Sequence, residues 1–114
     1  MRVGVDTFTL RDLNLDPFQQ LELIKDWELE GAQFGGLRGL SPDLDAGRFR
    51  EIRAKADELG LYSHVSLSAS CNPHVANMPL GDLRRMLAEE IAAAAACGWH
   101  EIHCSLGGVE ERYI

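Results

Sequence analysis

The sequence has no long hydrophobic run and no excess of positive charge. Its longest apolar stretch, Ile91–Cys97, is mostly alanine and is much shorter than the roughly 20 residues that cross a bilayer. The 11 Lys and Arg residues are outnumbered by 18 Asp and Glu residues, so the net charge is −7, and the basic residues form no cluster. Binding to a phosphate backbone requires a basic patch. We therefore expect neither nucleic acid nor a membrane surface as a partner.

Cysteine is also scarce, and the N-terminus lacks the apolar stretch of a signal peptide, because Arg2 and Asp6 interrupt it. The three cysteines, Cys71, Cys97 and Cys104, cannot all pair within the chain, and their spacing fits no metal-binding knuckle. No base lies near them in sequence, so a nucleophilic thiol has no support. We expect a cytoplasmic protein whose cysteines are small buried or loop residues.

The chain does have the proportions of a globular domain, with 46% apolar and 25% charged residues in a length that suits one domain. Helical periodicity occurs three times, over Phe18–Trp27, Phe49–Leu59 and Leu83–Ala94. Pro17 suits the first position of the first helix. The residues expected to cap the N-termini of the three helices are Asp16, Asp45 and Asp82.

The three expected helices end in the same way. Gly60-Leu61 and Gly98-Trp99 each place a glycine at the left-handed position that follows a helix, with an apolar residue next. Glu28-Leu29 takes the equivalent place after the first helix, with Glu where Gly is expected. These ends are 32 and 38 residues apart, the size of a βα unit. One strand is expected before the first helix and one after each helix, over Arg2–Thr7, Ala32–Gly35, Tyr62–Ser68 and Glu101–Ser105.

The order β-α-β-α-β-α-β predicts a parallel sheet with right-handed crossovers. Alternation along the strands separates two faces. The face expected under the helices carries Val3, Val5, Ala32, Phe34, Val65, Leu67, Ile102 and Cys104. The opposite face carries Gly4, Asp6, Gln33, Gly35, His64, Ser66, Ser68, His103 and Ser105.

A polar face argues against an open doubly wound sheet, which needs apolar residues on both sides. A barrel keeps its helices outside, and its interior can be polar where a site is built. We therefore predict a partial (β/α)₈ TIM barrel, about the first three and a half βα units, as a single domain over residues 1–114. A complete barrel has about 250 residues, so we expect this one to be truncated after its fourth strand.

Four segments resemble the sugar phosphate isomerase/epimerase family of xylose isomerase-like barrels. They correspond in order to its first strand, its second strand with the preceding turn, the end of its second helix, and its third helix with the fourth strand. These segments are Arg2–Thr7, Leu29–Gly35, Ala54–Leu61, and Ala93–Gly98 leading into Glu101–Gly107.

This resemblance implies a divalent metal, Mn²⁺ or Mg²⁺, held by carboxylates and a histidine of later strands, and proton transfer beside a carbonyl of a sugar or sugar phosphate. The ligands are expected beyond Ile114, so this chain supplies no metal ligand and no catalytic residue, and alone it is expected to be inactive. Gln33 stands where the family often has Glu. Glutamine can hydrogen-bond a sugar hydroxyl but cannot act as a base.

Active sites of such barrels gather at the C-terminal ends of the strands. Asp6 could instead cap its own loop, and His64 and His103 could be packed, hydrogen-bonded side chains. The residues expected to contact substrate are Asp6, Phe8, Gln33, His64, Ser66, Ser68, His103 and Ser105.

Three other features have simpler interpretations. Gly35–Gly39 could bring backbone amides and Arg38 to an anion, although a flexible loop is the simpler expectation. His74 lies in a long loop that could cover a substrate, and otherwise faces solvent. Glu89 and Glu90 are expected on a solvated helix face.

The sequence thus favours the N-terminal portion of a metal-dependent sugar or sugar-phosphate isomerase or epimerase. One alternative is a non-catalytic half-barrel that requires self-association or a complementary C-terminal chain. An abasic-site endonuclease shares the barrel, but the charge of −7 argues against it. An open-sheet domain that binds a small molecule is disfavoured by the polar strand face.

Overall fold

Strands and helices alternate in the predicted order, with three short helical segments added between them. The computed structural model describes residues 1–106, so Gly107 and the expected truncation point lie outside the described part. The elements are β1 (Gly4–Asp6), the 3₁₀ helix η1 (Thr7–Leu13), α1 (Pro17–Asp26), β2 (Gly31–Gly36), α2 (Leu37–Leu40), α3 (Ala46–Glu58), β3 (Tyr62–Ser66), α4 (Pro73–Ala76), α5 (Leu80–Ala96) and β4 (Ile102–His103).

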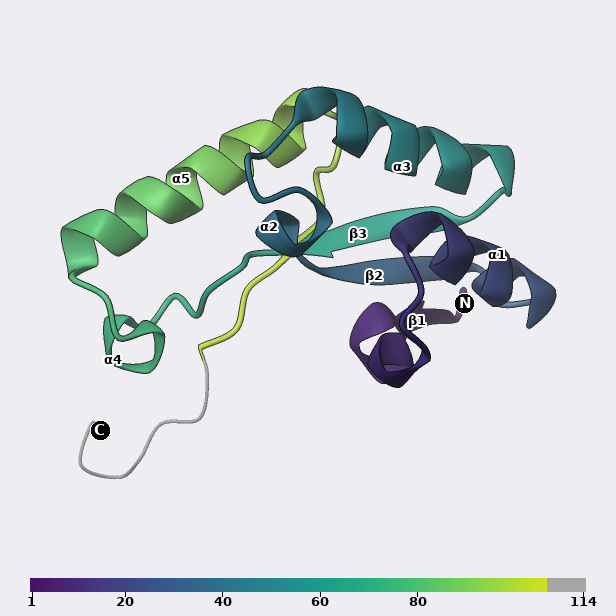
Figure 1. The fold of residues 1–114 in the computed structure, drawn as a ribbon, viewed down its shortest axis with the longest axis horizontal. Coiled ribbons are helices and arrows are strands. Elements are labelled where there is room, and N and C mark those ends of the chain that lie inside the picture. The colour runs from purple at the N-terminus through teal and green to yellow at the C-terminus, as the bar shows by residue number, and fades with distance from the viewer. Residues whose placement is uncertain (107–114) are drawn as a thin grey trace.

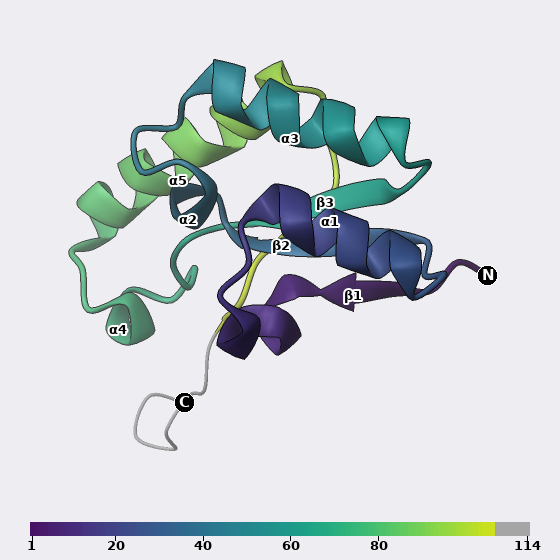
Figure 2. The same ribbon diagram turned by 45° about the vertical axis from the view of Figure 1, so that its right-hand side comes forward.

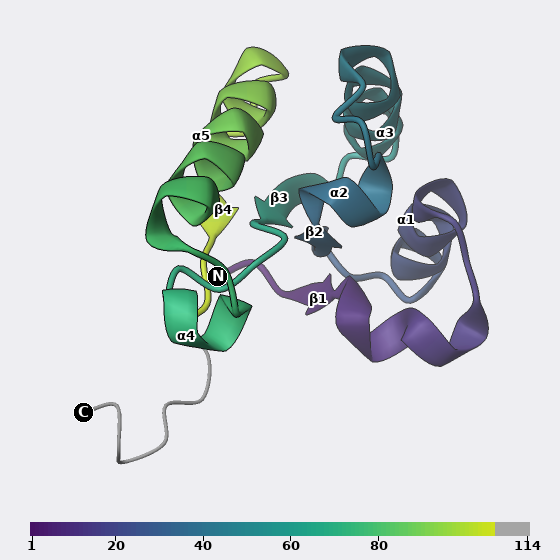
Figure 3. The ribbon, with the colours of Figure 1, turned by 60° about the vertical axis from the view of Figure 1, so that its left-hand side comes forward.

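The four strands form one parallel sheet in the order β1-β2-β3-β4. The helices α1, α3 and α5 lie along one side of the strands and leave the other side open (Figures 1 and 3). In the view turned by 45°, α1 and α3 lie over β1–β3 and α5 runs behind them (Figure 2). The described part of the chain is therefore an α/β fold with a four-stranded parallel sheet.

The apolar face of the sheet packs against the helices, as the alternation predicts. Ala32, Phe34 and Val65 are fully buried, and Val5 and Ile102 pack against the same core. Val3, Leu67 and Cys104 were expected on this face but do not join the core, because all three lie outside the short strands that form. The buried helical side chains that complete the core include Leu21, Ile24, Phe49, Ile52, Ala56 and Ala94.

Two of the three expected helix starts are confirmed. Asp16 accepts a hydrogen bond from the Gln19 backbone and the Gln19 side chain accepts one from the Asp16 backbone, so the two form a capping box. Asp45 caps α3. The prediction for Asp82 is wrong, because α5 begins two residues earlier, after Pro79. Asp82 lies in the first turn instead, where a carboxylate favours the positive end of the helix.

The three helix ends have the predicted geometry. The φ angles of Glu28, Gly60 and Gly98 are 59°, 71° and 86°. After each helix, two backbone amides donate to carbonyls of the last turn; for example, Glu28 donates to Lys25 and Leu29 donates to Ile24. Glu28 is thus a non-glycine residue in the left-handed region.

Candidate functional site

A row of polar side chains crosses the open face of the sheet. Asp6, Gln33 and His64 come from β1, β2 and β3 and are direct neighbours in the strand register. Glu101, just before β4, continues the row. Gln33 Nε2 donates to Asp6 Oδ2 at 3.3 Å, and His64 Nε2 lies 2.6 Å from Glu101 Oε2. The row therefore consists of the hydrogen-bonded pair Asp6–Gln33 and, beside it, the close pair His64–Glu101.

Asp6 fulfils the capping role that the sequence left open. Its Oδ1 accepts a hydrogen bond from the Phe8 backbone at 3.0 Å, at the start of η1. Its Oδ2 faces Gln33 at the same time. One carboxylate oxygen thus caps the turn after β1, and the other bonds Gln33 in the polar row. Capping therefore does not remove the carboxylate from the open face.

Tyr62 forms the floor beneath the polar row. The register places Gly4, Gly31 and Tyr62 side by side on β1, β2 and β3. A Cβ on Gly4 would collide with the Tyr62 hydroxyl, and a Cβ on Gly31 would collide with its ring. The two glycines therefore leave room for one tyrosine to lie across two neighbouring strands. The Tyr62 ring also lies against that of His64, with the ring centres 4.9 Å apart.

Tyr62 and the polar residues line a cavity of about 240 Å³, bounded by Gly4, Val5, Asp6, Gln33, Tyr62 and His64. This volume is below the roughly 300–1,000 Å³ of typical ligand sites, so the cavity by itself is too small for a typical small-molecule site. Sequence reasoning did not single out Tyr62 or Glu101. Two-residue alternation could have found both, because each stands two positions before a histidine already assigned to this face.

Other predicted site residues lie apart from this cavity. Ser66 and His103 are register neighbours nearer the C-terminal ends of β3 and β4. Ser105 follows them and is exposed. Phe8 is exposed in η1, where the Arg11 guanidinium covers its ring. His74 is exposed in the short helix α4.

Ser68 does not continue the polar face, because β3 ends at Ser66. Its hydroxyl accepts a hydrogen bond from the Arg38 backbone at 2.9 Å, and its own amide donates to Glu90 Oε1 at 2.8 Å. The expectation of a solvated Glu90 is wrong, since its side chain is fully buried. Helix α5 turns Glu90 toward the loop after β3, while Glu89 stays exposed.

Arg38 is committed to protein contacts and not to an anion. It pairs with Glu89 at 3.2 Å, lies 3.6 Å from Glu90 Oε2, and donates to the Pro42 carbonyl. The flexible loop expected over Gly35–Gly39 is instead the end of β2 followed by α2. The two carboxylates therefore hold Arg38 in place.

Two of the cysteines form a pair that the sequence did not predict. Cys71, in the loop after β3, is disulfide-bonded to Cys104, which follows β4. Their Cα atoms are 6.7 Å apart, within the range that a disulfide spans. Cys97 is buried with a free thiol, as expected for a small core residue.

The described residues do not fit a complete metal site. Among residues 1–106, no group of three or more His, Cys, Asp and Glu side chains could hold a metal ion. The polar row has two carboxylates, but Asp6 and Glu101 are three strand spacings apart, on the order of 14 Å at ~4.8 Å per strand. They cannot share one cation.

The groups of the row and Tyr62 beside it can each form hydrogen bonds with hydroxyl groups. Carboxylate oxygens accept hydrogen bonds, the Gln33 amide both donates and accepts, and the Tyr62 hydroxyl does the same. The His64 ring supplies two further nitrogen atoms that can form hydrogen bonds. A sugar hydroxyl is both donor and acceptor, so it can pair with any of these groups.

No family model matches the chain, and neither a curated protein nor a solved structure is found to be similar to it. Within the described helices, none is long and apolar enough to cross a membrane.

Proposed function

We propose that this chain is the N-terminal portion of a (β/α)₈ barrel of the sugar phosphate isomerase/epimerase type, a cytoplasmic and metal-dependent enzyme. In this proposal, the open face of the sheet contacts a sugar or sugar phosphate. One observation carries it: the row Asp6–Gln33–His64–Glu101 covers one face of a parallel sheet whose other face is packed against helices.

The arrangement of Tyr62 supports the barrel. In barrels of this kind, side chains of neighbouring strands fill the interior in layers. Gly4, Gly31 and Tyr62 share one level of the sheet, and Asp6, Gln33 and His64 share the next level toward the C-terminal strand ends. An apolar and aromatic floor beneath a polar layer is the order expected for a barrel site that opens at that end. In this proposal, the divalent cation, Mn²⁺ or Mg²⁺, is held by residues of later strands, beyond Ile114.

The second candidate is a non-catalytic half-barrel that pairs with a second chain. The observation in its favour is that β1 and β4 are both edge strands of the described sheet. The two candidates differ in whether the open face binds a sugar or only another protein surface.

The proposed sugar-binding wall can be tested by amide-resolved NMR of the isolated chain. The ligands are an aldose, the corresponding ketose and their phosphates, with glycerol as a non-sugar control. We expect shifts of the Asp6, Gln33 and His64 resonances with an affinity on the order of 1 mM, as suits one wall of a site. Gln33→Ala should abolish the shifts.

Gln20→Ala is the matched control, because Gln20 lies on α1, on the helical side of the sheet. It should leave the sugar-induced shifts unchanged. Shifts confined to the helical side, or equal shifts with glycerol, would refute sugar recognition by the open face.

A further inference from the structure

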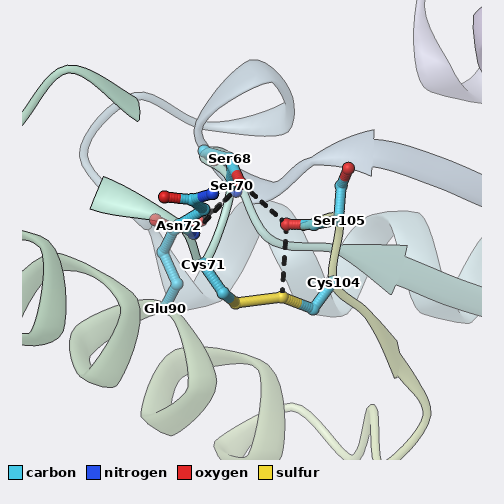
Figure 4. The surroundings of a disulfide bond; sticks show 7 residues. All are labelled: Ser68, Ser70, Cys71, Asn72, Glu90, Cys104 and Ser105. Carbon is cyan, nitrogen blue, oxygen red and sulfur yellow. Dashed lines mark hydrogen bonds between the residues drawn. A yellow bond between two sulfur atoms is a disulfide. The ribbon is translucent and has the colours of Figure 1, made fainter. Parts of the chain in front are cut away.

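The loop after β3 is tied to the segment after β4 at one place. There Cys71 and Cys104 are disulfide-bonded, and the Ser105 carbonyl accepts hydrogen bonds from the Cys71 amide at 2.9 Å and the Ser70 hydroxyl at 3.0 Å. Figure 4 shows the disulfide and the Ser70 hydroxyl meeting the same short stretch of chain. A covalent bond and two hydrogen bonds thus converge on Cys104-Ser105.

Apart from this tie, β4 is held by the packing of Ile102 against the core, by the His64–Glu101 pair before it and by a short ladder to β3. It is two residues long and pairs only with β3 among the described strands. The Val65 amide donates to Glu101 at 3.4 Å, and the Leu67 amide donates to His103 at 3.0 Å. An edge strand with so few ladder bonds has little local stability. The disulfide is therefore the strongest restraint on the end of β4.

The beginning of the loop has its own anchors, which do not depend on the disulfide. The Ser68 amide donates to the buried carboxylate of Glu90, and the Ser68 hydroxyl accepts from the Arg38 amide. Breaking the disulfide leaves these contacts in place. The segment that gains freedom is then the end of β4 with His103 and the following residues up to Ser105, and not the loop at Ser68.

We propose that Cys71–Cys104 is a reversible thiol–disulfide site that locks the end of β4. A dithiol reductant opens it by attack of one thiolate on one sulfur, which forms a mixed disulfide and releases the other cysteine as a thiolate that takes up a proton. The second thiol of the reductant then attacks the mixed disulfide and releases the other cysteine of the pair as a thiol. The oxidised reductant leaves as a cyclic disulfide or, if it is a protein, with a disulfide of its own. In balance, two electrons and two protons pass to the cysteine pair.

Accessibility and surroundings suit this exchange. Cys104 is exposed and Cys71 is half-buried, so a reductant can reach the bond, whereas the third cysteine, Cys97, is buried. Disulfides of cytoplasmic proteins are mostly transient or redox-sensing, and in this one respect the inference rests on the cytoplasmic location of the proposed function. The inference concerns the mobility of β4 and stands whether or not the open face binds a sugar.

Hydrogen exchange measured by mass spectrometry tests the lock on the full 114-residue chain. The intact mass of the oxidised chain should be lower than that of the reduced chain by the mass of two hydrogens. Reduction by dithiothreitol should accelerate amide exchange at residues 102–105 by about tenfold or more. Exchange at Arg38 and Ser68 should not change. Cys104→Ser should exchange like the reduced chain under all conditions, and Cys97→Ala should respond to reduction as the unaltered chain does.

Three free thiols after oxidation, or equal exchange at residues 102–105 in the two states, would overturn the proposal. Glutathione buffers of varied thiol-to-disulfide ratio then test reversibility. A Cys71–Cys104 pair that opens and closes within this series supports the proposal. A pair that stays oxidised at every ratio is a static structural disulfide, and this result contradicts the proposal.

Discussion

Glu90 shows how one residue can join elements that are distant in sequence. Its side chain is fully buried, and it links α5 to the Ser68 amide and to Arg38 of α2. Glu90 Oε2 and Arg38 Nε have no hydrogen-bond partner among the described residues. The ion pair therefore compensates the burial of the carboxylate only in part, and its role is to position the loop after β3.

Removing this carboxylate should destabilise the fold more than removing its exposed neighbour. Glu90→Ala leaves the Ser68 amide without its acceptor and Arg38 without its buried partner, so we expect a loss of about 2–4 kcal/mol. Glu89→Ala, where the side chain is 57% exposed, should change stability by less than about 1 kcal/mol. Urea denaturation followed by circular dichroism measures both. Equal effects would show that Glu90 is not the anchor of this loop.

At the scale of whole elements, the helix ends repeat one design. In each, an apolar residue follows the left-handed position and covers the helix end; Leu61 and Trp99 are almost fully buried there. The Trp99 ring packs edge-on against Phe49 of α3, and its indole donates to Ser63 of β3 at 2.9 Å. The helix end thus also fixes how α5 meets α3 and the sheet. The first helix end differs from the other two only in having Glu28, and not glycine, at the left-handed position.

Replacing Glu28 by glycine should relieve backbone strain. A left-handed conformation costs a residue with a Cβ roughly 1–2 kcal/mol, and the greater freedom of glycine in the unfolded chain offsets part of the gain. We expect Glu28→Gly to stabilise the protein by about 0.5 kcal/mol, seen as a higher denaturation midpoint. The reverse change at an equivalent end, Gly60→Ala, should destabilise it by about 1 kcal/mol through strain alone, since a Cβ there meets no neighbour. A lower midpoint for Glu28→Gly would contradict the strain.

For the whole molecule, the exposed sheet is the dominant feature. The strands at both edges of the described sheet have no neighbouring strand on one side, and α1, α3 and α5 leave the other face of the sheet open (Figure 3). Free strand edges are templates for pairing with another chain. The same surface is what a barrel buries when further strands complete it.

The isolated 114-residue chain should therefore self-associate. Multi-angle light scattering at tens of micromolar, the range in which exposed strand edges associate, should give a mass well above the 12.6 kDa of one chain. Val3→Lys places a charge beside the β1 edge and should shift the chain toward monomer. Leu13→Lys is the control, since Leu13 is equally exposed, at 53% against 52%, but stands at the end of η1, whereas Val3 directly precedes β1. A monomeric unaltered chain would refute the prediction.

Much of the fold follows from local patterns in the sequence. The helix ends at residues 28, 60 and 98, the caps Asp16 and Asp45, and the buried face with Ala32, Phe34 and Val65 were all predicted correctly. Of the candidate site, alternation placed Asp6, Gln33 and His64 on one face, and they line one cavity. Some predictions failed on local grounds, such as the start of α5 at Asp82, and others failed because a distant residue binds the side chain, as for Ser68 and Glu90.

The sequence by itself determined the order of strands and helices, the two faces of the sheet and the three helix ends. These depend on side-chain periodicity and on backbone conformations that neighbouring residues dictate. Only the tertiary structure decided that Tyr62 lies over Gly31, that His64 meets Glu101 and that Cys71 joins Cys104. Each of these contacts joins different βα units, so it depends on strand register and on the path of the loops. A local sequence pattern does not determine how close residues of different βα units lie, because this distance depends on the packing of the whole core.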